Sequence, residues 1–304
     1  MLVDGADQTL WVAGPSLRAA ERRNDVLFLE TIGCSDAERR EIERRFAENR
    51  AWPIDPVVDF MVAHTNGILY QSVKGRLPRY PIPDLRLPPG DGKVLLDVGC
   101  SWGRWCVAAA RKGYSVVGLD PSLGAIKAAR RVSQQLGAPA RFVVGDAMRL
   151  PFAPETFDVV FSYSVLQHFG KESARLAVKG IRRVVKTGGT SLIQMANVLG
   201  IRSLQHQLRR GFREPKDFEV RYWSPWEMKG SFNELIGESV LSVDGYFGLG
   251  MQASDIDLMP RRYRIVVRGS EVLRRASMKA PFIGGFADSL YIASRKGGPK
   301  SAAD

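Results

Sequence analysis

The run VLLDVGCSWG, residues 94–103, constrains the fold of this chain more than any other stretch. Its apolar beginning, Val94 to Val98, is typical of a short strand buried on both faces of a parallel sheet. Gly99 and Gly103 then predict a tight turn, and residues 105–112 have a helical pattern. Backbone N–H groups without partners point outward where a turn enters a helix, so the sequence predicts an anion site here.

The spacing of the glycines limits which classes of ligand this turn can bind. A dinucleotide fingerprint reads G-x-G-x-x-G, whereas this turn reads D-x-G-x-x-x-G with Ser101 in the middle. No Lys-Ser/Thr pair follows, so the phosphate loop of ATPases is also absent. The carboxylate of Asp97 can accept from a ligand ammonium group while the turn N–H groups bind a carboxylate. This pairing favours an amino-acid moiety.

Polar residues follow the later predicted strands. In a doubly wound sheet, ligands bind beyond the carboxyl ends of the strands. Asp120 ends one strand, and a carboxylate there can accept both hydroxyl groups of a ribose. Asp146, after the next strand, can accept from an adenine amino group, and Ser162 ends the strand after that. The predicted strands are residues 94–98, 115–120, 141–144, 157–162 and 190–195.

Five segments of the chain resemble the class I S-adenosylmethionine-dependent methyltransferases, in particular the small-molecule group of methyltransferase type 11. They are LLDVGCSWGRW, VVGLDPS, FVVGDAMRLPF, FDVVFSYSVLQHF and VVKTGGTSLI, in this order between Lys93 and Met195. Each segment alone is a weak signal, but five in register are specific. The resemblance implies an α/β fold, a doubly wound, Rossmann-like, mostly parallel seven-stranded sheet. Residues 241–248 and 288–294 are expected as its antiparallel end.

The same resemblance implies S-adenosyl-L-methionine as the cofactor. Asp97 and Gly99 are expected on its methionine part, Asp120 on the ribose, and Asp146 with Ala147 on the adenine. The further expected cofactor contacts are Cys100, Gly103, Pro121 and Ser162. Ser101 departs from the commoner D-x-G-x-G-x-G turn, a departure that many members of the family tolerate.

His168 is the candidate catalytic residue. Methyl transfer from a sulfonium is an in-line displacement that needs alignment, exclusion of water and sometimes proton removal, but no metal. Histidine titrates near neutral pH and can take a proton from a hydroxyl, although His168 can instead line the cofactor pocket or pack beside Phe169. The candidate acceptor contacts are Tyr163, Gln167, Tyr222 and Trp223, with capping and helix packing as the alternatives.

The segments around this core are predicted more coarsely. Residues 1–88 are expected as an N-terminal helical or lid segment, and residues 89–297 as the methyltransferase domain. The domain carries insertions at about 198–224 and 251–287, and residues 298–304 are expected as a disordered tail. Capping boxes begin helices at Ser35 and Ser224, and Asp55-Pro56 begins another. Trp102 is a candidate border of the cofactor's methionine end.

Basic residues concentrate in the two insertions. His206 stands among Arg202, Arg209 and Arg210, which predicts a solvated basic face or, alternatively, contact with an anionic substrate. The helix expected over residues 261–279 carries seven basic residues against one acid. Three interpretations remain open for it: a solvated face, an anionic membrane surface, or nucleic acid.

Composition bounds the function without selecting it. At 304 residues, with 45% hydrophobic and 25% charged residues, the chain is an ordinary globular sequence. Its few scattered cysteines predict a reduced, cytoplasmic setting, and its net charge of +12 permits peripheral contact with an anionic membrane or another anionic partner. The expected activity is O-methylation of a small or amphiphilic metabolite, sugar-bearing or lipid-linked, with nitrogen or carbon acceptors open.

Two other functions remain as alternatives. A nucleic-acid methyltransferase, acting on RNA, is favoured by the charge but lacks the N/D-P-P-Y/F tetrad of amino-group modifiers. A non-catalytic protein that binds S-adenosylmethionine has no sequence feature of its own.

Overall fold

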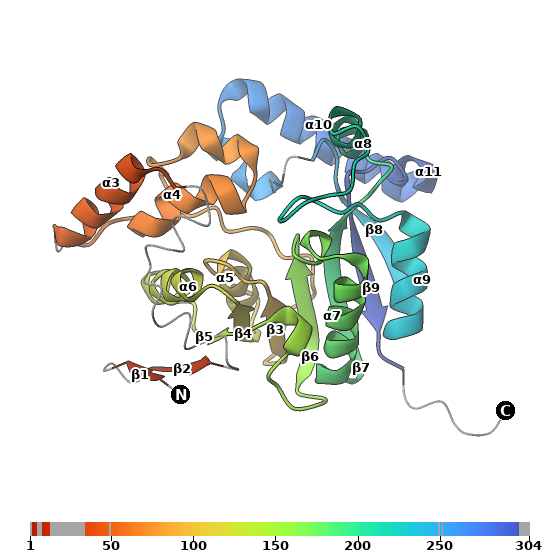
Figure 1. The fold of residues 1–304 in the computed structure, drawn as a ribbon, viewed down its shortest axis with the longest axis horizontal. Helices are drawn as coiled ribbons and strands as arrows, with labels where there is room; N and C mark the ends of the chain where they lie inside the picture. The colour runs from red at the N-terminus through yellow and green to blue at the C-terminus, as the bar shows by residue number, and fades with distance from the viewer. Residues whose placement is uncertain are drawn as a thin grey trace. The chain divides into compact units, whose positions relative to one another are not determined.

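The computed structural model describes residues 2–4, 8–12, 34–48, 50–248, 250 and 252–297 (Figure 1). The chain divides into two compact units. Unit 1 comprises Met1–Gly92, Cys100–Asp146 and Leu249–Val267, and unit 2 comprises Lys93–Gly99, Ala147–Gly248 and Arg268–Asp304. The expected tail at residues 298–304 lies outside the described residues.

The described residues of unit 1 form four strands in the order β1-β2-β5-β4. Strands β4 (Ser115–Asp120) and β5 (Ala140–Val144) pair in parallel, as their apolar runs predict. Strand β2 (Gln8–Val12) adds to β5 in parallel, and β1 (Leu2–Asp4) pairs with β2 antiparallel. The sequence did not predict β1 and β2, because the first 88 residues were expected to be helical.

The helices of unit 1 begin where their caps predict. In α3 (Asp36–Ala47) the Ser35 side chain accepts from the Glu38 N–H and the Glu38 side chain accepts from the Ser35 N–H. In α4 (Pro56–Thr65) the Asp55 carboxylate accepts from two N–H groups of the first turn. The elements that complete the unit are α5 (Arg104–Arg111), α6 (Leu123–Gln135), η1 (Ile68–Val73) and η4 (Ala253–Leu258). Buried alanines let α5 and α6 pack closely on β4 and β5.

Unit 2 contains five strands in the order β3-β6-β7-β9-β8. They are β3 (Val94–Val98), β6 (Phe157–Tyr163), β7 (Val185–Ala196), β8 (Ser239–Gly245) and β9 (Ser289–Arg295). The first three run parallel, and β9 is antiparallel to both β7 and β8. All seven predicted strands are therefore present, and the mostly parallel, doubly wound α/β class is confirmed.

One boundary in unit 2 differs from the prediction. Helix α7 (Lys171–Val184) ends before the Gly188-Gly189 pair, and β7 begins at Val185 rather than at Thr190. The register against β6 shifts between Phe157 and Val159, where Gly188 adopts a φ of +78°. The glycines therefore form an irregularity inside the strand.

The remaining helices of unit 2 lie near the end of the chain. Helix α9 (Pro225–Leu235) begins at the predicted Ser224 capping box and packs with α7 on the antiparallel end of the sheet (Figure 1). Helix α8 (Ile201–Arg209), α11 (Pro281–Gly284) and the short η2 (Ala147–Arg149) and η3 (Leu166–His168) complete the unit. Helix α10 (Arg261–Lys279) has the predicted bounds.

Candidate active site

The turn after β3 depends on Gly99. Its φ of +78° lies in the left-handed region, and a Cβ there would overlap the Val165 side chain. Asp97, before this turn, is almost completely buried at the end of β3. The buried Ser162 hydroxyl donates to the Val98 carbonyl at 2.8 Å, so it joins β6 to β3. Gly99 and Asp97 therefore have positions that other residue types would not reproduce.

The next residues form a backbone cradle within unit 1. The Gly103 N–H donates to the Cys100 carbonyl at 2.9 Å, which closes the turn. Gly103 is the N-cap of α5, with a φ of +82° and no side-chain cap. N–H groups in the first turn of a helix have no intrahelical acceptor, so a ligand carboxylate can satisfy them. Buried Cys100 donates its own N–H to the Leu119 carbonyl at 3.0 Å, and its thiol lies 3.7 Å from the Ser101 carbonyl oxygen.

Asp120 is held by the backbone at the end of β4. One carboxylate oxygen accepts from the Ser101 N–H and the other from the Ser122 N–H, each at 2.9 Å. Burial raises the pKa of Asp120 to about 6, although these two hydrogen bonds oppose the rise. Each oxygen keeps a further lone pair, which is what the two hydroxyls of a ribose require.

The other predicted cofactor residues lie along the same chain segments. Half-buried Asp146 follows β5, and the neighbouring Gly145 N–H donates to the Asp120 carbonyl at 3.1 Å. Ala147 is buried at the start of η2, whereas Pro121 is exposed after β4. Trp102 is completely buried in unit 1 and donates its indole N–H to Asn66 at 3.2 Å, so it belongs to the core.

His168 lies in the η3 loop after β6, in unit 2. Its Nδ1 is 2.7 Å from the Phe218 carbonyl oxygen. A carbonyl can only accept, so Nδ1 carries the hydrogen and Nε2 of the neutral ring is the proton acceptor. Burial lowers the pKa of His168 and the Arg221 charge adds to this, whereas backbone hydrogen bonds to Phe218 and Ser164 oppose it. The ring is therefore neutral, as a general base requires.

The same loop holds two candidate acceptor contacts. The Tyr163 hydroxyl donates to the Asp244 carboxylate at 2.9 Å. The Gln167 amide donates to the Ser164 hydroxyl at 2.6 Å, and its buried oxygen finds no donor among the described residues. A buried amide oxygen without a donor is costly, so it marks a place where a ligand hydroxyl or water would bind.

Residues 218–223 support this loop from outside. Arg221 donates its backbone N–H to the Gln167 carbonyl at 2.7 Å and its guanidinium to the His168 carbonyl at 2.8 Å. Trp223 is buried, with the Lys171 ammonium 5.6 Å from its ring, and its buried indole N–H finds no acceptor among the described residues. The Tyr222 hydroxyl lies 3.2 Å from Nδ1 of His206.

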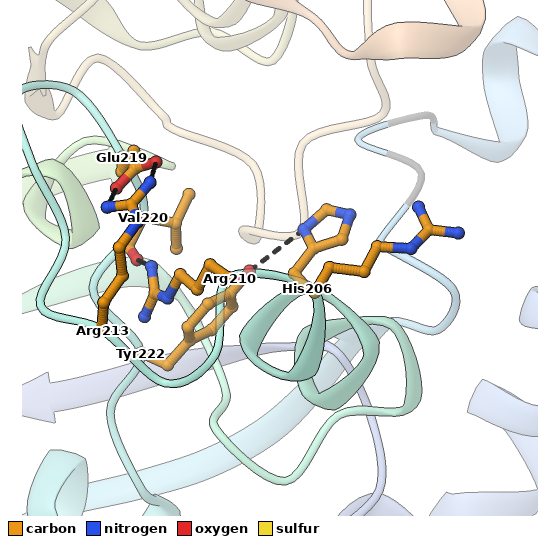
Figure 2. A pocket seen from close by; sticks show the side chains of 7 residues that line it. His206, Arg210, Arg213, Glu219, Val220 and Tyr222 are labelled. Carbon is orange, nitrogen blue, oxygen red and sulfur yellow. Dashed lines mark hydrogen bonds and ion pairs between the residues drawn. The ribbon is translucent and has the colours of Figure 1, made fainter.

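A cavity that the sequence did not predict opens beside Tyr222 (Figure 2). Its volume is about 490 Å³, and its lining is His206, Arg209, Arg210, Arg213, Glu219, Val220 and Tyr222. We call it the α8 pocket. The sequence favoured a solvated basic face around His206, because it did not show that residues 219–222 fold back beside α8. The run of basic residues was the one available signal.

Comparison with known proteins agrees with the motifs. A family model described as a methyltransferase domain matches residues 95–189. A demethylmenaquinone methyltransferase of Corynebacterium kroppenstedtii is 38% identical over 34% of this chain and 42% of its own length. A ubiquinone biosynthesis O-methyltransferase of Azorhizobium caulinodans is 32% identical over 55% of this chain and 74% of its own. A solved S-adenosylmethionine-dependent methyltransferase of Methanosarcina mazei is 17% identical over 70% of this chain and 100% of that chain, with a TM-score of 0.48.

The Azorhizobium relative, together with the family model, establishes the family. The chain belongs to the class I S-adenosylmethionine-dependent methyltransferases, in the type 11-like group. It spans 42% and 43% of the length of two of the curated relatives that it matches.

Proposed function

We propose that this protein binds S-adenosylmethionine and transfers its methyl group to a hydroxyl oxygen of a small, amphiphilic acceptor. The observation that carries the proposal is the geometry of His168. With Nδ1 donating to the Phe218 carbonyl and the pKa lowered by burial, Nε2 is ready to take a proton. A hydroxyl is a weak nucleophile while it keeps its proton, so an oxygen acceptor gains most from such a base.

The cofactor contacts follow from the turn and the strand ends. Asp120 accepts the ribose hydroxyls, and the N–H groups at the start of α5 bind the methionine carboxylate. Asp97 accepts from the methionine ammonium, and Asp146 with the Ala147 N–H reads the adenine edge. The bound cofactor supplies the methyl group. The chain's own part is to align the acceptor oxygen, exclude water and hold the proton on His168.

The acceptor class that we propose is lipid-linked or otherwise amphiphilic, with a sugar-bearing molecule as the second form. The names of the relatives are the first support, since they are methyltransferases of quinone biosynthesis. The second is an exposed face on α10, α11 and the residue that follows them. Its apolar members are more than half exposed: Val272, Met278, Phe282 and Phe286.

Basic residues share this face. Arg268, Arg275 and Lys279 are exposed on α10, and they alternate with the apolar residues. On the part of α10 that belongs to unit 2, Ser277 is buried and Leu273 and Ala276 are partly buried, whereas Val272 and Met278 remain exposed. Exposed aromatic rings with basic neighbours fit the surface of an anionic bilayer. Within the described residues, no helix has both the length and the apolar character needed to cross a membrane.

The proposed activity is tested by isotope transfer. The protein is incubated with S-adenosylmethionine labelled in its methyl group and with host extract, separated into lipid and aqueous fractions. We expect label in a small molecule of the lipid fraction, identified by mass. Label in RNA would favour the nucleic-acid alternative, and binding of the cofactor without any transfer would favour the non-catalytic one.

The membrane contact has its own test. We expect the protein to sediment with phosphatidylglycerol vesicles at low salt and to be released as salt rises, because each basic residue near the bilayer contributes about 1 kcal/mol. Phe282→Ala should weaken sedimentation, whereas Leu176→Ala, at a residue 54% exposed on α7, should not. Failure to sediment at low salt would contradict the membrane contact.

A further inference from the structure

The α8 pocket has more positive charge than its own residues neutralise. Arg213 forms a two-pronged ion pair with Glu219, at 2.7 and 2.6 Å, which cancels both charges (Figure 2). Glu219 is the only acid in the lining. The pocket is therefore left with the charges of Arg209 and Arg210.

Neither of these arginines has a carboxylate partner in the part of the chain that the structure describes. Arg209 is exposed at the end of α8, and its guanidinium makes no hydrogen bond within the described residues. Arg210 donates one guanidinium N–H to the Val220 carbonyl at 3.0 Å, while its buried Nε has no acceptor among the described residues. A guanidinium presents its donors in a planar fork that matches an oxyanion. Guanidinium N–H groups of both Arg209 and Arg210 are thus left to donate to a ligand.

His206 adds a group that responds to such a ligand. Burial lowers its pKa, the charges of Arg202, Arg209 and Arg210 lower it further, and Asp288 opposes them. Its Nδ1 meets the Tyr222 hydroxyl. An anion in the pocket would offset the arginine charges, so the pKa of His206 would rise.

The pocket also borders the loop that carries His168. Val220 and Tyr222 line the pocket, and Arg221 between them bonds to the carbonyls of Gln167 and His168. Val220 and Tyr222 therefore line the pocket, while Arg221 between them supports the loop that carries His168. A ligand that extends out of the pocket along this segment would approach His168.

We infer that the α8 pocket binds an oxyanion, a phosphate or carboxylate group, carried by the methyl acceptor. Arg209 and Arg210 bind the anionic group, and the Tyr222 ring with Val220 contacts the carbon skeleton beside it. The inference rests on the proposed function, since it describes one end of the acceptor. It makes the acceptor an acidic molecule whose methylated hydroxyl is separate from its anionic group.

The first experiment titrates the protein with inorganic phosphate and with phenyl phosphate, by calorimetry and by NMR of the His206 ring. Both ligands should bind and raise the pKa of His206. Arg209→Gln should weaken binding about 10-fold or more, the range for a hydrogen bond to a charged group. Arg40→Gln, at an exposed arginine on α3, removes the same charge and should leave affinity unchanged.

The outcomes separate the possible sources of the anion. Phenyl phosphate binding more tightly than inorganic phosphate supports an acceptor-borne group, because only the ester can use Tyr222 and Val220. Equal affinities would overturn that assignment in favour of a free anion. Equal affinities in Arg209→Gln and Arg40→Gln, or an unmoved His206 pKa, would overturn the pocket itself.

Two controls separate loss of anion binding from misfolding and from loss of cofactor binding. The Arg209 guanidinium makes no hydrogen bond or ion pair within the described residues, so its variant should fold. Arg210→Gln also loses the hydrogen bond to the Val220 carbonyl, so its folding needs a check by circular dichroism. The titrations require neither cofactor nor turnover. If the native protein does not bind S-adenosylmethionine, the proposed function is contradicted but the anion site is not. If it binds S-adenosylmethionine but neither phosphate ligand, the anion site is contradicted but the proposed function is not.

Discussion

The turn at residues 99–103 and the α8 pocket are both suited to anions, but they are built in opposite ways. The turn uses backbone N–H groups, held by glycines with φ of +78° and +82°. The α8 pocket uses long arginine side chains on the surface of a helix and its following loop. Backbone donors are fixed when the turn folds, whereas a flexible side chain loses rotamer freedom when it binds.

This difference predicts how each region tolerates change. A backbone site should fail through shape, when a substitution alters φ or fills the space that the ligand or a neighbour needs. A side-chain site should fail through chemistry, when one functional group is removed. The following predictions test that distinction, and the largest effect comes first.

Replacing His168 tests side-chain chemistry. His168→Ala should lower turnover by roughly 100-fold or more, because positioned bases contribute on the order of 10² to 10⁴. Cofactor affinity, measured by calorimetry, should hold. His64→Ala, at an exposed histidine on α4, is the matched control and should keep full activity.

The pH profile of turnover sharpens this test. His168 acts while neutral, and its pKa is lowered by burial, so turnover at saturating S-adenosylmethionine should persist below pH 6.5 and fall only as the pH drops through that lowered pKa. A fall in turnover that begins above pH 6.5 would assign His168 to the pocket lining instead. So would a His168→Ala variant that loses cofactor binding but not turnover.

Replacing Gly99 tests shape. Gly99→Ala must accept both a φ of +78° and an overlap with Val165, which together should cost about 2–5 kcal/mol of unfolding free energy and remove cofactor binding. Gly92→Ala has the same φ of +78° but nothing within 4 Å of the new Cβ, so it should cost only about 1–2 kcal/mol. Denaturant unfolding measures both. Equal costs would mean that backbone conformation alone, and not the overlap, makes Gly99 necessary.

Asp120 is the side chain that accepts a hydrogen bond from the turn at residues 99–103, through the Ser101 N–H. Asp120→Asn should weaken S-adenosylmethionine binding by about 1–3 kcal/mol at pH 8, where the native residue is ionised. Ribose hydroxyls donate to the charged carboxylate, so native affinity should fall as pH drops through about 6, the raised pKa of Asp120. The variant cannot ionise, and its affinity should be flat there. An identical pH profile in the variant would remove Asp120 from the cofactor site.

Much of the fold could be predicted because its signals are local. The bounds of β3, β4 and α10 agree with the prediction, and Ser35, Asp55 and Ser224 cap the helices that they were expected to cap. A buried strand needs an unbroken apolar run, and a helix start needs an acceptor for its free N–H groups. Such requirements involve only a few neighbouring residues, so they can be predicted from the sequence.

The positions of the glycine turn and of the acids at the strand ends were equally readable, since both are short patterns, while their contacts with the cofactor stay a prediction. The role of His168 could not be predicted in this way. Its sequence neighbours are equally compatible with a general base, a residue that lines the cofactor pocket and a ring packed beside Phe169. The Phe218 carbonyl, 50 positions away in the chain, is what selects the tautomer.

Tertiary structure alone decided the features that join distant segments. The β1–β2 pair, the burial of Trp102 beside Asn66, the exposed apolar face of α10 and the α8 pocket all depend on which segments meet. His206 and Tyr222 are separated by 16 positions, and no periodicity relates them. The sequence by itself determined where strands, turns and caps form, because backbone sterics and hydrogen bonding are local. The structure decided what surrounds each polar side chain, because burial and charge depend on neighbours that only folding brings together.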